Sequence, residues 1–160
     1  MPSVLFVCTA NICRSPMAMG LLRQQVSQDE RSWKIQSAGV WAEKGHPPSD
    51  FGRMVLLRRG IDIADHKSQP VTPKLVQDFN LILAMEERHK DALAAAFPAY
   101  SYRFYLLSEM VGKSFDVDDP FGLALPDYED TAQEIEQILQ EGFYIIQTLS
   151  VSNSINNERN

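Results

Sequence analysis

Near its start the chain reads Val4-Leu5-Phe6-Val7-Cys8-Thr9-Ala10-Asn11-Ile12-Cys13-Arg14-Ser15-Pro16, which predicts a strand, a tight loop and a helix in succession. Residues 4–7 have the β-branched, aromatic and aliphatic side chains that are typical of a buried strand. Pro16 suits the first turn of a helix, where its missing N–H would have no partner in any case. The loop between strand and helix therefore points several backbone N–H groups, and the positive end of the helix dipole, toward one spot.

Cys8 and Arg14 indicate what this spot binds. Arg14 supplies a planar, permanently charged fork that suits phosphate, and Cys8 ends the strand where its sulfur would face a bound tetrahedral oxyanion. The helix start and the nearby cation favour the reactive thiolate form, and the Ser15 hydroxyl can donate a hydrogen bond to the sulfur. A free cysteine that ends a buried strand is often only a small hydrophobic residue. The spacing to Arg14 and Ser15 favours a nucleophile instead.

The segment from Cys8 to Ser15 resembles the C-x5-R-S phosphate loop of the bacterial low-molecular-weight protein tyrosine phosphatases. Its position at the N-terminus is also similar to that family. Further pieces follow in the family's order, and they extend the resemblance over about residues 3 to 149: Ser37-Ala38-Gly39, Gly60-Ile61-Asp62, His66-Lys67-Ser68, residues 78–85 and Asp119-Pro120-Phe121. Gly122 stands where animal members have a second tyrosine, which favours the bacterial type.

Strand-like and helix-like segments alternate along the chain, which indicates βαβ units. Strands are expected at 4–7, 33–37, 81–85 and 102–106, and helices at 16–28, 50–59, 72–77, 87–96 and from about 130 to 149. This alternation predicts an α/β fold in which one domain, residues 1–150, has a four-stranded parallel sheet with helices on both faces. Residues 151–160 are expected to form a polar C-terminal tail.

Composition restricts location and partners. A chain of 160 residues with 44% hydrophobic residues fits one core, and a net charge of −6 argues against nucleic acid as a partner. The start has no basic signal region, and no apolar run approaches the ~20 residues of a membrane span. Two cysteines are too few for a disulfide framework. We therefore expect a cytoplasmic monomer that does not bind a membrane.

The resemblance implies a phosphotyrosine hydrolase that acts through a cysteinyl-phosphate intermediate. Cys8 would be the nucleophile and Arg14 the phosphate-binding cation. The phosphate-binding loop would consist of Cys8, Thr9, Ala10, Asn11, Ile12, Cys13, Arg14 and Ser15. Its substrates would be phosphotyrosine proteins, with a bacterial tyrosine kinase as a partner. No cofactor is implied, and no metal, because His46 and His89 have no partners at metal-ligand spacing.

An acid is needed to protonate the leaving oxygen. The loop Phe115-Asp116-Val117-Asp118-Asp119-Pro120 offers three carboxylates, a composition that is also typical of a solvated turn. Asp119 precedes a proline, which stiffens its backbone, and it matches the Asp-Pro acid of the family. Asp119 is therefore the predicted general acid, and Asp118 is expected to be exposed.

Supporting residues follow from the resemblance. Asn11 would hold a strained loop backbone, and Ser37 and His66 would brace Asn11. Cys13 would form a reversible disulfide with Cys8 that protects it from overoxidation, unless it merely fills space. Ala10 replaces the usual glycine, and a positive φ there would cost an alanine about 1 kcal/mol.

The cleft around the substrate is expected to have apolar walls. Ile12 and Phe121 are predicted to line it, with Phe121 making a slot deep enough for phosphotyrosine. Trp41, in a loop with two prolines, is either a second wall or a cover over the edge of the core.

Three other functions compete with this prediction. Arsenate reductases of the same fold need further cysteines, and this chain has none after Cys13. Protein-arginine phosphatases carry a threonine where this chain has Ile12, and an isoleucine suits an aromatic substrate. A noncatalytic phosphate-binding module would need neither the nucleophile Cys8 nor the acid Asp119.

Overall fold

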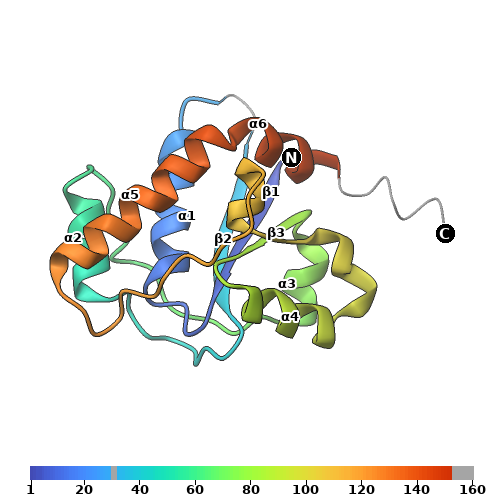
Figure 1. Ribbon diagram of the computed structural model, residues 1–160, viewed down its shortest axis with the longest axis horizontal. Coiled ribbons are helices and arrows are strands. Elements are labelled where there is room, and N and C mark those ends of the chain that lie inside the picture. The colour runs from blue at the N-terminus through green and yellow to red at the C-terminus, as the bar shows by residue number, and fades with distance from the viewer. Residues whose placement is uncertain (30–31, 153–160) are drawn as a thin grey trace.

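The computed structural model of the protein describes residues 1–29 and 32–152 (Figure 1). Within them the strands form one sheet in the order β2-β1-β3-β4, and every neighbouring pair is parallel. The strands are β1 (Ser3–Cys8), β2 (Lys34–Gly39), β3 (Leu81–Ala84) and β4 (Phe104–Leu106). The predicted α/β fold with four parallel strands is therefore confirmed.

Helices connect and cover these strands. They are α1 (Arg14–Gln25), α2 (Asp50–Leu57), α3 (Pro73–Asp78), α4 (Glu87–Ala96), α5 (Leu125–Glu141) and α6 (Phe143–Ser152), with the 3-10 helices η1 (Pro98–Arg103) and η2 (Leu107–Val111). No helix of the described residues is both long and apolar enough to cross a membrane.

The alternation of side chains along β1 builds a separate core on each face of the sheet. Val4 and Phe6 belong to the larger core, which includes buried residues of α1, α2 and α5. Leu5 and Val7 belong to the smaller core, with residues of α3 and α4. Figure 1 shows α1 and α5 on one side of the sheet and α3 and α4 on the other. Both faces of β1 are thus covered. Because successive side chains on both faces are buried, the sequence of β1 is apolar without alternating polar residues.

The predicted last helix is two helices. α5 begins at Leu125, earlier than expected, because Asp127 accepts a hydrogen bond from the backbone N–H of Ala124 and caps the first turn. α5 ends at Glu141, and α6 begins after Gly142. A Cβ at Gly142 would come within 2.8 Å of both the Cβ and the carbonyl oxygen of Met110. A close approach to η2 therefore requires glycine at this break.

Other expected bounds shift by a few residues. η1 replaces the start of the strand predicted at 102–106, and β4 begins at Phe104. α6 continues through Ser152, so the first residues of the predicted tail at 151–160 are helical. Residues 153–160 lie outside the described part of the chain.

β1 and β2 end side by side at the edge of the sheet where the phosphate loop begins, with Cys8 opposite Gly39. Gly39 lies against that loop: a Cβ there would be 2.5 Å from the Thr9 carbonyl oxygen and 3.0 Å from the Asn11 nitrogen. Only a glycine allows β2 to approach the loop this closely. The carboxyl ends of parallel strands are where α/β proteins place their ligand sites.

Candidate active site

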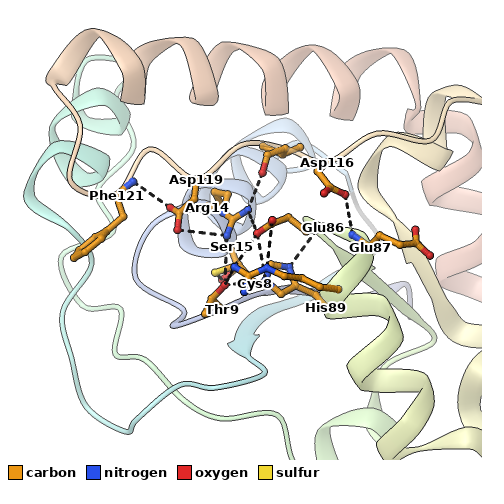
Figure 2. Close-up of polar contacts among 12 residues, drawn as sticks. Cys8, Thr9, Arg14, Ser15, Glu86, Glu87, His89, Asp116, Asp119 and Phe121 are labelled. Atoms are coloured by element: carbon orange, nitrogen blue, oxygen red, sulfur yellow. Dashed lines mark hydrogen bonds and ion pairs between the residues drawn. The ribbon is translucent and has the colours of Figure 1, made fainter.

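A cavity of about 170 Å³ opens at this edge of the sheet. Its lining consists of Cys8, Thr9, Ala10, Ile12, Cys13, Arg14, Asp119 and Phe121. Figure 2 shows Cys8, Arg14 and Ser15 gathered in one cluster, with Asp119 and Phe121 on the loop before α5. The fold thus brings the three predicted catalytic side chains, which are up to 111 residues apart in sequence, to one cavity.

The Cys8 sulfur has a hydroxyl partner. Cys8 Sγ lies 2.9 Å from Ser15 Oγ. Asn11 Nδ2 donates to the same Ser15 oxygen at 2.8 Å, and the Ala38 carbonyl lies 3.5 Å away, so the sulfur is the nearer acceptor for the hydrogen of Ser15. Cys8 itself is 3% exposed. The Ser15 hydroxyl therefore lies where it can donate a hydrogen bond to the Cys8 sulfur.

Asn11 holds the turn of the loop. Among the described residues, only Asn11 combines a side chain with a left-handed backbone, at φ 60°, and asparagine tolerates this region better than most residues. Its Nδ2 also donates to Ser37 Oγ at 2.9 Å, and its Oδ1 accepts from the Gln69 backbone N–H at 3.0 Å. The strain expected for Ala10 falls on Asn11 instead, because Ala10 has no positive φ.

His66 contacts the same loop from outside. Its Nε2 lies 2.8 Å from the Asn11 carbonyl oxygen, so that nitrogen carries a hydrogen and donates it. Burial lowers the pKa of His66, although the bond to Asn11 opposes this effect. A neutral imidazole that donates through Nε2 satisfies a loop carbonyl at neutral pH.

Arg14 is buried, and its guanidinium is held through one nitrogen. Nη1 donates to Glu86 Oε2 at 2.6 Å and to the Val117 carbonyl at 2.7 Å. Nε is buried and has no hydrogen-bond partner among the described residues. Nη2 has only longer contacts, with Thr9 Oγ1 at 3.5 Å and Asp119 Oδ2 at 3.6 Å. The Nε–Nη2 edge is therefore the one that suits two oxygens of a phosphate.

The loop of residues 115–120, which carries Asp119, is attached through Val117 to the end of β3. The Val117 N–H donates to the Met85 carbonyl at 2.8 Å, while the Val117 carbonyl accepts from Arg14. Asp116 accepts from the Glu87 N–H at the start of α4. Asp118 is exposed, as expected. Asp119 lies at the cavity, where its Oδ1 accepts from the Phe121 N–H at 3.1 Å.

The cavity has one apolar wall. Ile12 and Phe121 line it, and Phe121 is 64% exposed, so a ring bound there would cover it. Trp41 is not among the lining residues. It lies under the Arg88 guanidinium, 5.5 Å from ring centroid to Cζ, and meets the His89 ring edge-on. Of the two roles considered for Trp41, a wall of this cavity is therefore not the one that its contacts support.

Cys13 lines the cavity beside Cys8. Its sulfur lies 3.5 Å from the Tyr128 hydroxyl. Burial raises the pKa of the Cys13 thiol, and burial together with Cys13 raises the pKa of Tyr128 to about 12. Both groups are therefore protonated at neutral pH. The structure thus places a neutral thiol in the same cavity as Cys8.

Glu86 and His89 complete the site from the first turn of α4. Burial opposes the ionisation of Glu86, but the hydrogen bonds from Arg88 and Arg14 outweigh it and lower the pKa of this carboxyl. Burial, followed by the charge of Arg14, lowers the pKa of His89 to about 4. The carboxylate is thus charged and the imidazole neutral at physiological pH. Among the described residues no group of three side chains could hold a metal ion.

Comparison with known proteins identifies the family. The family model described as low molecular weight phosphotyrosine protein phosphatase matches residues 3–153. The chain belongs to this family. It is therefore a phosphatase, and the resemblance found in its sequence is confirmed.

The relatives of this phosphatase differ in their substrates. A protein-arginine-phosphatase of Bacillus subtilis is 34% identical over 139 residues, which cover 86% of this chain and 92% of that protein. EpsP of Ralstonia solanacearum, a probable low molecular weight protein-tyrosine-phosphatase, is 36% identical over 135 residues, covering 84% and 89%. A crystal structure of a low molecular weight protein tyrosine phosphatase from T. tengcongensis is 36% identical with a TM-score of 0.87, and covers 91% of this chain and 99% of that one.

Sequence reasoning missed Glu86 and His89 as parts of this phosphatase site. One signal was available: a buried arginine requires a carboxylate partner, and residues that directly follow a buried parallel strand lie at the ligand-binding edge. Glu86 follows β3 in this way. His89 offered no signal, because its contact with Thr9 joins residues 80 positions apart.

Proposed function

We propose that the protein is a protein tyrosine phosphatase that hydrolyses phosphotyrosine through a cysteinyl-phosphate intermediate. The apolar wall of the cavity carries this proposal. Ile12 and Phe121 line the space above the Cys8 sulfur, and a phenyl ring packs favourably on such side chains. A phosphoarginine guanidinium would have to be desolvated against them. Ile12 has no hydroxyl to offer in exchange.

In the first step the Cys8 thiolate attacks phosphorus. The S–P bond forms as the bond from phosphorus to the tyrosine oxygen breaks. Asp119, as the acid, gives its proton to that oxygen, so tyrosine leaves neutral. The Nε–Nη2 edge of Arg14 and the loop N–H groups hold the charge on the other phosphoryl oxygens.

In the second step water cleaves the S–P bond. Asp119 is now a carboxylate and takes a proton from the attacking water. Phosphate forms, and the electron pair of the S–P bond returns to Cys8 as a thiolate. The hydrogen bond from Ser15 Oγ, 2.9 Å from the sulfur, stabilises that leaving thiolate. Asn11, Ser37 and His66 serve the reaction only by holding the loop.

The proteins dephosphorylated would be phosphotyrosine proteins of the same cell, among them a bacterial tyrosine kinase. The depth of the cavity supports only a substrate with a long phosphorylated side chain. Cys8 is 3% exposed, so the phosphoryl group must reach it on a long side chain. Phosphoserine is too short for this, whereas phosphotyrosine and phosphoarginine both reach.

The deciding experiment compares peptides of one sequence that carry phosphotyrosine, phosphoarginine or phosphoserine. We expect the highest kcat/KM on phosphotyrosine and the lowest on phosphoserine. In an Ile12→Thr variant the ratio of phosphotyrosine to phosphoarginine activity should fall by about ten-fold or more, since a hydrogen bond to a charged group is worth about 1.5–3 kcal/mol. A wild-type protein that prefers phosphoarginine would contradict the proposal and assign the chain to the arginine phosphatases.

A further inference from the structure

His89 is a fully buried imidazole beside the phosphate loop, and its two nitrogens have different roles. The backbone N–H of Glu86 donates to Nδ1 at 3.2 Å. Nδ1 is therefore the nitrogen without a hydrogen, and Nε2 carries one. Nε2 lies 2.8 Å from Thr9 Oγ1. In this contact His89 is the donor and the Thr9 hydroxyl oxygen is the acceptor.

Two cationic side chains also donate to the same oxygen. Arg88 Nη2 lies 3.0 Å and Arg14 Nη2 lies 3.5 Å from Thr9 Oγ1. A hydroxyl oxygen has two lone pairs, so His89 and Arg88 fill them and Arg14 makes a weaker third contact. The hydroxyl hydrogen cannot point at any of these donors. Within residues 1–29 and 32–152 no acceptor lies within hydrogen-bond distance of it.

Thr9 lines the cavity next to the phosphate-facing edge of Arg14. Figure 2 shows Thr9 beside Cys8 and in contact with His89. We propose that the Thr9 hydroxyl donates its hydrogen to an oxygen of the bound phosphoryl group, and that His89 sets its direction. Thr9 is then a catalytic residue, because it touches the substrate. His89 is a positioning residue, which acts through Thr9.

This inference rests on the proposed function, since it takes the cavity above Cys8 as the phosphoryl site. Inorganic phosphate is the probe, measured as a competitive inhibitor of p-nitrophenyl phosphate hydrolysis. Thr9→Val keeps the shape of the side chain and removes the hydroxyl, whereas Thr9→Ser keeps the hydroxyl. The matched control is Thr148→Val, on the exposed face of α6, where the hydroxyl donates to the Tyr144 carbonyl.

We expect Thr9→Val to raise the inhibition constant of phosphate by about ten- to a hundred-fold, the effect of a lost hydrogen bond to a charged group. Thr148→Val should match the wild type, and Thr9→Ser should bind phosphate more tightly than Thr9→Val because it keeps the hydroxyl. Thermal unfolding is measured for each variant, and the inhibition constants are compared at a temperature at which all the variants are folded. If folded Thr9→Val binds phosphate as tightly as the wild type, the inference is wrong while the proposed function stands. If phosphate does not inhibit the wild type, both are wrong.

Two His89 variants separate its two hydrogen bonds. His89→Gln places an amide N–H near the position of Nε2 and keeps a donor to Thr9. His89→Asn places an amide oxygen near Nδ1 and keeps only the acceptor for the Glu86 N–H. We expect His89→Gln to bind phosphate more tightly than His89→Asn. The opposite order would show that His89 acts by capping α4 and not by directing Thr9.

Discussion

Acidification should destabilise this protein through His89. The imidazole has no exposed surface and faces the cations Arg14 and Arg88, with Glu86 and Asp116 as the carboxylates nearby. Burial and the charge of Arg14 lower its pKa to about 4. In the unfolded chain a histidine has a pKa of about 6.5. Folding therefore favours the neutral form of the His89 imidazole.

The sign and size of the effect follow from this difference. Between pH 6.5 and pH 4 the unfolded chain binds a proton at this position and the folded protein does not, so the free energy of unfolding falls as the pH falls. Each pKa unit corresponds to about 1.36 kcal/mol. The full loss is then roughly 3 kcal/mol, and roughly 2 kcal/mol of it is reached at pH 5. Below pH 4 both states are protonated and the loss stops.

The assay is urea unfolding followed by circular dichroism from pH 7 to pH 4.5, for the wild type and His89→Gln. Glutamine does not titrate, so the wild type should lose roughly 2 kcal/mol more than the variant on going from pH 7 to pH 5. His46→Gln is the control, because the His46 side chain is exposed and, among the described residues, its ring forms a hydrogen bond only with Glu43. Parallel curves for the wild type and His89→Gln would refute the argument. They would mean that His89 is protonated in the folded protein at pH 5.

Two further predictions concern the proposed roles of Asp119 and Cys13. Asp119→Asn should lower kcat on a phenyl phosphate with a poor leaving group by about 10²–10³, and far less on p-nitrophenyl phosphate, whose leaving group needs little protonation. Asp118→Asn should change either rate only slightly, and a steeper leaving-group dependence in that variant would move the acid by one residue. After mild peroxide, dithiothreitol should restore the wild type but not Cys13→Ser, because only Cys13 can trap oxidised Cys8 as a disulfide. Equal recovery of both proteins would remove that role from Cys13.

Local patterns predicted the fold well because each element follows from its own residues. The apolar run at 4–7 reports a strand buried on both faces, and Val4 and Leu5 do enter different cores. The break at Gly142 was not predictable in this way. The glycine there is required by the close approach of Met110, 32 residues earlier in the sequence. Apolar residues on both sides of the break keep a helical spacing, and they therefore suggested one continuous helix.

The site residues differ in the same way: those marked by their own sequence neighbours were predictable, and those brought to the site only by tertiary contacts were not. Residues 8–15 form one loop, and their spacing alone places Cys8, Arg14 and Ser15 together. Asp119 was found through its neighbour Pro120. Glu86 and His89 belong to the site only because β3 ends beside β1, a fact of tertiary structure. The sequence left the role of Trp41 open for the same reason, since its partner Arg88 comes from α4.

Glu86 bears on how a chain of net charge −6 binds a phosphate dianion. A buried arginine without a partner would be costly, and Glu86 offsets that cost. A carboxylate on the Nε–Nη2 edge would compete with phosphate for the same donors. Glu86 instead takes Nη1, 2.6 Å away, and Val117 takes the same nitrogen. The pair thus holds Arg14 without occupying the edge that the substrate needs, and loop N–H groups, Arg14 and the Thr9 hydroxyl can act on the phosphoryl group together.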